Sequence, residues 1–152
     1  MGLFNFGKKF IERCPLALPI CAALYGICGR NRKKIRGRSN EIDAKEAFLR
    51  QNRITIRGNN NKITVGKKCL LKGCRFSIVG NDNVIKIGDM TAANKVLFCI
   101  ENNNNHITVG SHCLFAGSAQ LAAIEGTDIC IGELSAERGY CFQDRGQPLD
   151  VG

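Results

Sequence analysis

Tryptophan is absent from this chain of 152 residues, and aromatic residues make up only 7% of it. With so few aromatic residues, a hydrophobic core has to be built from Ile, Val, Leu, Ala and Cys, which suits stacked thin layers better than one aromatic-centred core. Apolar residues are nevertheless 44% and charged residues 23% of the chain, as in ordinary globular proteins. Length and composition therefore predict one folded domain.

The sequence also has no long uninterrupted apolar run. The longest, CPLALPICAALYGIC at 14–28, is interrupted by Pro15 and Pro19 and is shorter than the roughly 20 residues that cross a bilayer. A secretory signal is not indicated, because the strongest positive charge follows the run and no small-residue cleavage site is evident. We expect a helix or helical hairpin in residues 1–39 that caps the fold or lies on a membrane surface. Basic residues after such a run stay cytoplasmic, so the predicted location is cytoplasmic, at most peripheral to the inner membrane.

Cysteine is plentiful, with nine residues, but no C-x-x-C pair occurs. That spacing marks many zinc sites and redox dithiols, so no metal site is predicted. Three cysteines fall in the apolar run, at Cys14, Cys21 and Cys28. Five others fall among Ile, Leu and Phe, at Cys69, Cys74, Cys99, Cys113 and Cys130. This placement favours a reduced cytosolic protein that uses Cys as a small apolar filler.

Acidic residues are few: the chain has 13 against 22 Lys and Arg, a net charge of +9. The excess is concentrated at 30–38, RNRKKIRGR, which has six basic residues and no acidic one. Such a run is either a solvated linker or, because it directly follows the apolar run, a contact with anionic lipid. Nucleic acid is not predicted as a partner, because no aromatic residue is interleaved with the basic ones and no nucleic-acid module is recognisable.

A repeat of constant length begins near Arg53. Short motifs with alternating apolar residues end in glycines that lie 22 residues apart, namely ITVG at 63–66, IKIG at 85–88, ITVG at 107–110 and ICIG at 129–132. A second motif, G-x-x-C-L-[LF], follows at 66–71 and 110–115, and further apolar stretches lie at 76–79, 97–100 and 121–124. A fixed period of this length is the signature of stacked repeats.

Each motif is preceded by an asparagine-rich turn. The period aligns these residues in two columns, Asn59, Asn81 and Asn103 in one and Asn61, Asn83 and Asn105 in the other. Asparagine tolerates the left-handed backbone conformation of tight corners. Stacked amides can also bond to one another along the axis, as in the asparagine ladders of stacked sheets. The columns therefore predict a repeated corner held by such ladders.

Together these patterns predict an all-β fold, a single-stranded parallel β-solenoid over residues 40–133 that follows an N-terminal helical segment. Three six-residue sides and a four-residue loop account for a coil of 22 residues and favour a left-handed β-helix. A right-handed β-helix has coils of similar size and remains the alternative. Residues 40–50 are expected to form either a first imperfect coil or a short helix.

The stretch NNNKITVGKKCLLKGCRFSIVGNDNVIKIG, followed by IENNNNHITVGSHCLF and LAAIEGTDICIG, resembles bacterial hexapeptide-repeat acyltransferases. The nearest subgroup is the O-acetyltransferase-like proteins of capsule and lipopolysaccharide gene clusters. The resemblance covers about residues 40–133 and implies transfer of an acetyl group from acetyl-CoA to a sugar or polysaccharide hydroxyl. It also implies a homotrimer with active sites between subunits, and a His general base in a segment reading roughly R-T-G-D-S-H-S, one coil beyond IEGTDICIG.

Residues 134–152 depart from both the repeat and the family. The repeat predicts G-x-x-C-L-L from Gly132, whereas the chain reads GELSAERGYCFQDRGQPLDVG. Back-translated with permitted codons and read one base later, this tail becomes CLLSVDIVFRTGDSHSML, which contains both the missing Cys-Leu-Leu and R-T-G-D-S-H-S. We therefore interpret the tail as a frameshift product, caused by loss of about two bases after Glu133, and expect this chain to be incomplete and inactive.

Four polar residues of the repeat are candidates for chemistry. His106 lies in an asparagine-rich corner, His112 repeats the position of Lys68, and Glu125 and Asp128 flank a turn. All four are expected to face solvent, and no Ser-His-Asp or Cys-His set is readable. No catalytic residue, cofactor-binding residue or metal ligand is therefore assigned in this chain.

Three functions are compatible with these patterns. The first is an acyltransferase by descent, present here in an incomplete form. The second is a non-catalytic solenoid that serves as a binding or scaffold module, with the tail as a true cap. The third is a right-handed solenoid that cleaves polysaccharide, which would need paired carboxylates or a cationic base on one sheet face, and no such cluster is readable. We rank the three in this order.

Overall fold

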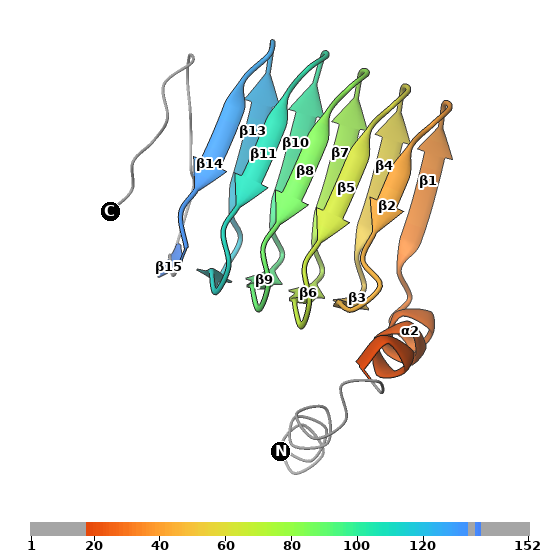
Figure 1. Ribbon diagram of the computed structural model, residues 1–152, viewed down its shortest axis with the longest axis vertical. Helices are drawn as coiled ribbons and strands as arrows, with labels where there is room; N and C mark the ends of the chain where they lie inside the picture. The colour runs from red at the N-terminus through yellow and green to blue at the C-terminus, as the bar shows by residue number, and fades with distance from the viewer. Residues whose placement is uncertain (1–17, 134–135, 138–152) are drawn as a thin grey trace.

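The described part of the chain, residues 18–133 and 136–137 of the computed structural model, is a parallel β-solenoid of about five turns preceded by one short helix. Each coil contributes one strand to each of three sheets, here named A, B and C (Figure 1). Every pairing is parallel and joins a strand to its equivalent one coil away. The predicted fold class is confirmed.

The three sheets have five strands each. Sheet A contains β1 (Arg32–Arg36), β4 (Arg53–Arg57), β7 (Arg75–Val79), β10 (Leu97–Glu101) and β13 (Gln120–Ile124). Sheet B contains β2 (Glu41–Asp43), β5 (Lys62–Val65), β8 (Val84–Ile87), β11 (His106–Val109) and β14 (Asp128–Ile131). Sheet C contains β3 (Phe48–Arg50), β6 (Leu70–Lys72), β9 (Ala92–Asn94), β12 (Leu114–Phe115) and β15 (Ala136–Glu137).

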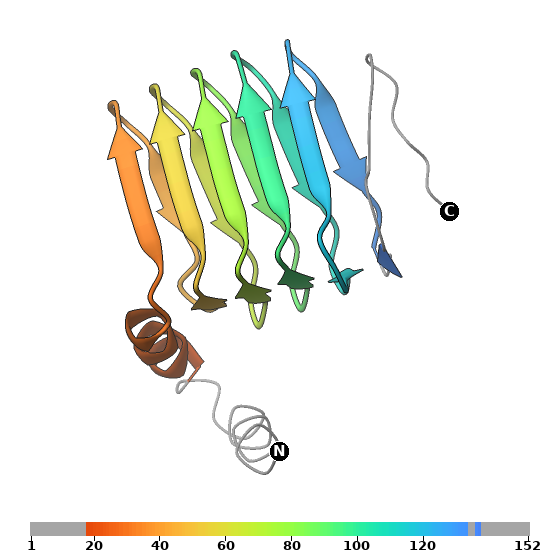
Figure 2. The same ribbon diagram turned by 180° about the vertical axis from the view of Figure 1, so that it is seen from behind.

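The coils turn in the left-handed sense. In Figure 1 the strands of sheet A lie behind and run upward, those of sheet B lie in front and run downward, and successive coils advance from right to left. Figure 2 shows the same course from behind, with sheet A in front. Viewed from the N-terminal end, the chain therefore turns anticlockwise as it moves away, which is the handedness that the six-residue sides favoured.

The interior is built from residues that stack on their own equivalents. Strands alternate between buried and exposed positions because only one face of each sheet meets the interior. The register aligns Ile56, Ile78 and Ile100, all fully buried. The rings of Phe76 and Phe98 stack with centroids 4.7 Å apart and planes 7° from parallel. Because each layer repeats the last, a chain without tryptophan still fills its core.

A buried ladder of asparagine side chains joins the coils at the corner between sheets A and B. The amide Nδ2 of Asn83 donates to Oδ1 of Asn61 at 3.0 Å, and that of Asn105 donates to Oδ1 of Asn83 at 3.1 Å. All three residues are fully buried. The ladder begins at Asn40 and ends at Thr127, whose backbone N–H donates to Asn105. The predicted ladder is therefore confirmed.

A second ladder runs along the exposed side of the same corner. The backbone N–H of Asn59 donates to Oδ1 of Asn81 at 2.9 Å, and that of Asn81 donates to Oδ1 of Asn103 at 2.7 Å. These bonds point toward the C-terminus, whereas those of the buried ladder point toward the N-terminus. The residues between the two ladders have positive φ, at Asn60 (56°), Asp82 (57°) and Asn104 (58°). Asn and Asp tolerate this conformation, which explains why all positions of the corner are rich in them.

The solenoid starts earlier than its predicted boundary at residue 40. The basic run at 30–38 contains β1, which pairs with β4 from Arg32 onward, so the interpretation of this run as a linker is wrong. The alternation of the repeat is hidden in β1 because Lys33 takes the register position where the next coil has the buried Ile54. Residues 40–50 form β2 and β3 and complete the first coil, as one of the two expectations for them proposed.

Helix α2 (Leu18–Cys28) confirms part of the predicted N-terminal helix. It packs against β3 at the first coil, while residues 14–17 of the apolar run lie outside the described part. In residues 18–133 and 136–137, no helix is long and apolar enough to cross a membrane. At the other end, β15 pairs with β12 and aligns Ala136 with Leu114 and Glu137 with Phe115. The rest of the predicted non-repeat tail, 134–152, lies outside the described residues.

Candidate functional site

The structure brings together two of the four candidate residues, His106 and Asp128. They begin β11 and β14 on the outer side of sheet B, where the register aligns them one coil apart. The ring Nδ1 of His106 lies 2.6 Å from Oδ1 of Asp128. When Nδ1 carries the proton and donates a hydrogen bond to the carboxylate, Nε2 is the unprotonated, basic nitrogen. The pair thus has the orientation that a carboxylate gives to a histidine general base.

The surroundings of this pair are those of a surface ion pair. Both side chains are exposed, at 48% and 74% of their area. In the same outer column, Lys62 pairs with Glu41 at 3.0 Å in the same way. Opposite charges aligned across strands stabilise a sheet by a few tenths of a kcal/mol to about 1 kcal/mol. The arrangement therefore accounts for the pair as cross-coil stabilisation, and it supplies no nucleophile or enclosed space for a substrate.

The pair was missed in the sequence, although its signal is visible there. His106 and Asp128 are 22 residues apart and directly precede the aligned motifs at 107–110 and 129–132. The other two candidates are solvent-facing, as expected. His112 sits in a turn with φ of 60°, where its N–H donates to the carbonyl of Asp89 at 2.9 Å. Glu125 occupies a corner with φ of 59°.

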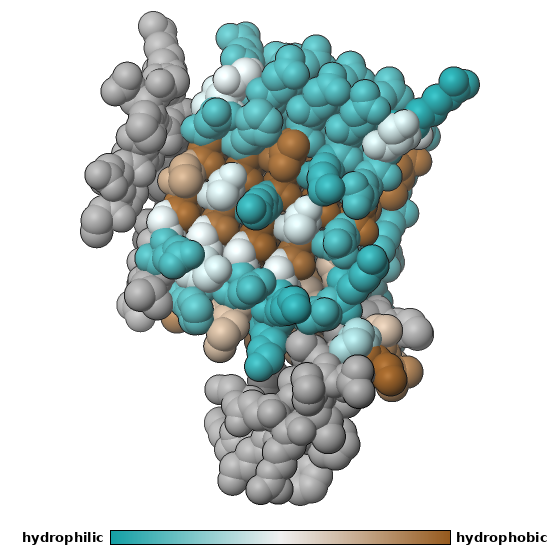
Figure 3. Space-filling model, in the orientation of Figure 1, coloured by the Kyte–Doolittle hydropathy of each residue, from teal (hydrophilic) through white to brown (hydrophobic). Residues whose placement is uncertain are grey.

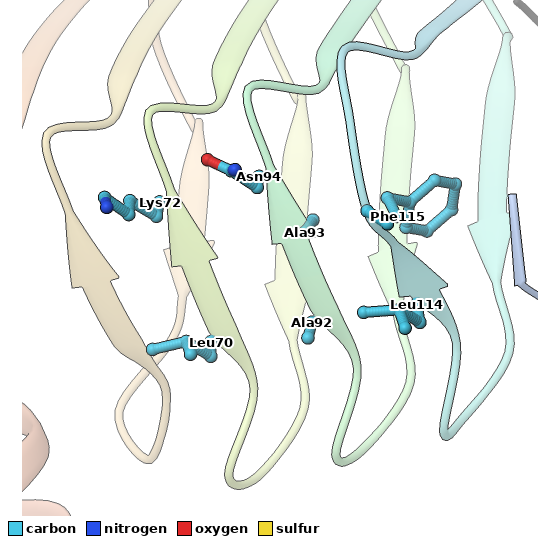
Figure 4. Close-up of a pocket in the computed structure, with 8 residues that line it drawn as sticks. Leu70, Lys72, Ala92, Ala93, Asn94, Leu114 and Phe115 are labelled. Atoms are coloured by element: carbon cyan, nitrogen blue, oxygen red, sulfur yellow. The ribbon is translucent and has the colours of Figure 1, made fainter. Parts of the chain in front are cut away.

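The outer side of sheet C carries a shallow apolar groove. Leu70, Ala92 and Leu114 follow one another from coil to coil, and Ala92 is the low point between two leucines (Figure 4). Lys72 and Asn94 form the next row of the same surface. The groove is open and its lining is mostly apolar, with Lys72 and Asn94 as its polar residues.

The cysteines of the described residues differ in burial: some are buried and some exposed, while Cys21 and Cys99 are partly buried. Burial raises the pKa of the Cys69 and Cys74 thiols to about 11. Cys69 and Cys113 donate their S–H groups to carbonyls of the next coil, at 2.9 and 3.0 Å, so they join coils as well as fill space. The interpretation of Cys as apolar filler is confirmed for these residues. It is wrong for Cys130, which faces solvent from the outer side of sheet B.

Thiol labelling should separate these groups. With the native chain at about pH 8, we expect iodoacetamide to modify Cys28 and Cys130 at least about 100-fold faster than Cys69 and Cys74, because a thiol of pKa about 11 is almost wholly protonated there. Mass spectrometry of quenched peptides measures each site. In denaturant all four should react alike, and fast labelling of Cys69 in the native chain would contradict the assignment.

Within the described residues, no group of three or more His, Cys, Asp and Glu side chains could hold a metal ion. The fold defines the chain as a parallel β-solenoid protein. No protein-family model, curated protein or solved structure matches the chain.

Proposed function

We propose that this chain is the solenoid part of an acetyl-CoA-dependent O-acetyltransferase that acts on a sugar or polysaccharide hydroxyl. The observation that carries the proposal is the register of the solenoid, applied to the alternate reading frame of residues 134–152. The 22-residue repeat led to that frame, and the strand pairings of the structure show at which positions of the coil its residues would stand.

The alternate frame continues the coil. Two added bases after Glu133 place its Cys-Leu-Leu at positions 135 to 137, and one coil earlier these positions hold Cys113, Leu114 and Phe115. Strand β15 already pairs with β12 at positions 136 and 137. Cys113 donates its S–H to the carbonyl of Gly132, so a cysteine at position 135 would repeat an existing contact between coils. The alternate frame thus supplies the residue types that the register requires.

At the same spacing, the Asp-Ser-His of that frame would fall at the corner between sheets A and B, with its His one coil beyond Thr127. That is the corner where the ladders of Asn83 and Asn81 run. A histidine there would accept the proton of the sugar hydroxyl while the hydroxyl oxygen attacks the thioester carbonyl carbon. The carbon–sulfur bond then breaks, the acetyl group stays on the sugar oxygen, and coenzyme A leaves as its thiol.

The donor, the assembly and the location follow the family resemblance. We propose acetyl-CoA as donor, a homotrimer with active sites between subunits, and a cytoplasmic enzyme. The excess of 22 Lys and Arg over 13 acidic residues suits the phosphates of coenzyme A.

Restoring the frame should create activity. We expect the repaired gene product to release coenzyme A thiol from acetyl-CoA in the presence of sugar acceptors, and the present chain to give no signal above background. The measurement is thiol release together with mass spectrometry of the acetylated sugar. Alanine in place of the alternate-frame His should lower the rate by about 10²–10⁴-fold, whereas His106→Ala in the repaired product should change it less than about twofold.

The DNA sequence after the codon for Gly132 decides whether the repaired product exists. The proposal requires an open alternate frame through D-S-H-S into further V-G repeats. A closed frame, or a repaired product without acetyl transfer, would overturn it. The binding or scaffold module would then take its place, with residues 134–152 as a true cap that limited proteolysis leaves attached.

A further inference from the structure

The register of sheet A gathers basic side chains from three coils on one surface. Arg32, Arg53 and Arg75 align in one outer column, and Arg36 aligns with Arg57 in another. Lys34 lies between them on β1, and all six residues are exposed. We call this surface the basic face, made of Arg32, Lys34, Arg36, Arg53, Arg57 and Arg75.

Among the described residues, no acidic side chain forms an ion pair with the basic face. Strands β1, β4 and β7 contain no Asp or Glu. Adjacent strands lie about 4.8 Å apart, so like charges in one column repel each other and weaken the sheet. This repulsion is relieved when an anionic surface lies against the face.

Helix α2 presents an apolar stripe at the same end of the solenoid. Ile20, Ala23, Leu24 and Cys28 are exposed, and their spacing puts them on one side of the helix. Ile20 and Leu24 leave 64% and 58% of their surface in solvent, and the helix contains no charged residue. Figure 3, which looks onto the side of sheet B, shows brown surface at the lower right, where α2 lies.

Helix α2, which carries the stripe, and β1, which begins the basic face, are neighbours in the chain and in space. Three residues, 29–31, connect α2 to β1. In Figure 2, α2 lies directly below β1 at the first coil. One of these connecting residues, Arg30, is exposed and adds a further positive charge between the two surfaces.

We propose that the basic face and the apolar stripe of α2 together dock on an anionic lipid bilayer. A bilayer with acidic headgroups supplies negative charge to the arginines and an acyl boundary to Ile20 and Leu24. A soluble polyanion would neutralise the charges and leave the stripe in water. The bilayer is therefore the partner that uses both features. The inference is independent of acetyl transfer, because the face lies on the first three coils and requires no residue beyond Glu133.

Flotation of the full chain with vesicles tests the proposal. We expect binding to phosphatidylcholine vesicles that contain phosphatidylglycerol and none to phosphatidylcholine alone. Each basic residue near such a surface contributes about fivefold to the partition constant, so R53Q/R57Q/R75Q should weaken binding on the order of 100-fold. The matched control K45Q/K72Q/K86Q removes the same charge from exposed residues elsewhere and should weaken it much less.

The apolar contribution has its own variant. I20S/L24S should lower binding to anionic vesicles at least about tenfold and make the remainder strongly salt-dependent, since screening shortens to about 3 Å in 1 M salt. Circular dichroism shows whether each variant keeps its strands. The proposal would be overturned if the arginine and lysine variants lost vesicle binding equally, or if the chain bound neutral vesicles alone. It would also be overturned if I20S/L24S had no effect and the chain bound heparin as tightly as anionic vesicles. The last result would assign the face to a soluble polyanion.

Discussion

Replacing Gly80 with alanine should prevent the chain from reaching its folded state or lower its unfolding free energy by more than about 4 kcal/mol. Gly80 directly follows β7, at the corner that carries the asparagine ladders. Its φ is 132°, a conformation essentially restricted to glycine. A Cβ there would overlap the carbonyl group of Asn102 on the next coil and lie 2.5 Å from its carbonyl carbon. That backbone is fixed by the ladder bond from Asn83 to the Asn102 carbonyl, so it cannot move aside without breaking the corner.

The matched control for this change is Gly117→Ala. Gly117 lies in the turn before β13, where an added Cβ meets no atom within 4 Å and φ is not positive. Alanine there should leave stability unchanged or raise it by up to about 1 kcal/mol, because it restricts only the unfolded chain. Circular dichroism during urea unfolding measures both variants. A Gly80→Ala midpoint within experimental error of the Gly117→Ala midpoint would contradict the close approach of the coils.

The 22-residue period was enough to predict the fold because residues at equivalent positions of successive coils make equivalent contacts. Ile85 and Ile107 are buried equivalents in sheet B, and the asparagine columns of the sequence became the two ladders. Strand β1 of the first coil escaped prediction for a physical reason. At the end of a stack, one side of the strand has no further layer, so Lys33 is tolerated at an inward register position and the alternation disappears.

The surfaces were less predictable than the core, since they depend on which residues the coils align. Arg53, Arg57 and Arg75 are separated along the chain, and only the strand register shows that they share one surface with the basic residues of β1. Cys130 follows an apolar residue in ICIG, yet the same alternation that buries Ile129 turns it to solvent. The two-residue alternation of a strand predicts that Cys130 is exposed, and the 22-residue spacing predicts that His106 and Asp128 are paired.

Replacing Asn83 should reveal how much the buried ladder contributes. Its side chain donates to Oδ1 of Asn61 and to the carbonyl of Asn102, at 3.0 and 2.9 Å, and accepts from the backbone N–H and Nδ2 of Asn105. Asn83→Ala removes these four hydrogen bonds and takes the Asn83 partner away from the Asn102 carbonyl and from the backbone N–H of Asn105. Each buried polar group left unsatisfied costs about 1–3 kcal/mol. We therefore expect a loss of about 3–5 kcal/mol in the free energy of unfolding.

An isosteric change separates hydrogen bonding from volume. Asn83→Asp keeps the shape of the side chain but replaces its Nδ2 donor with an oxygen that faces two acceptors in a buried site, so it should destabilise at least as much as alanine at neutral pH. The same change at Asn81 affects the exposed ladder, where Oδ1 still accepts from Asn59 and water is available, and should cost less than about 1 kcal/mol. Urea unfolding of the three variants, Asn83→Ala, Asn83→Asp and Asn81→Asp, provides the comparison. Equal losses at the two positions would mean that the corner is held by shape and backbone pairing, and that the ladder of buried amides contributes no specific stability.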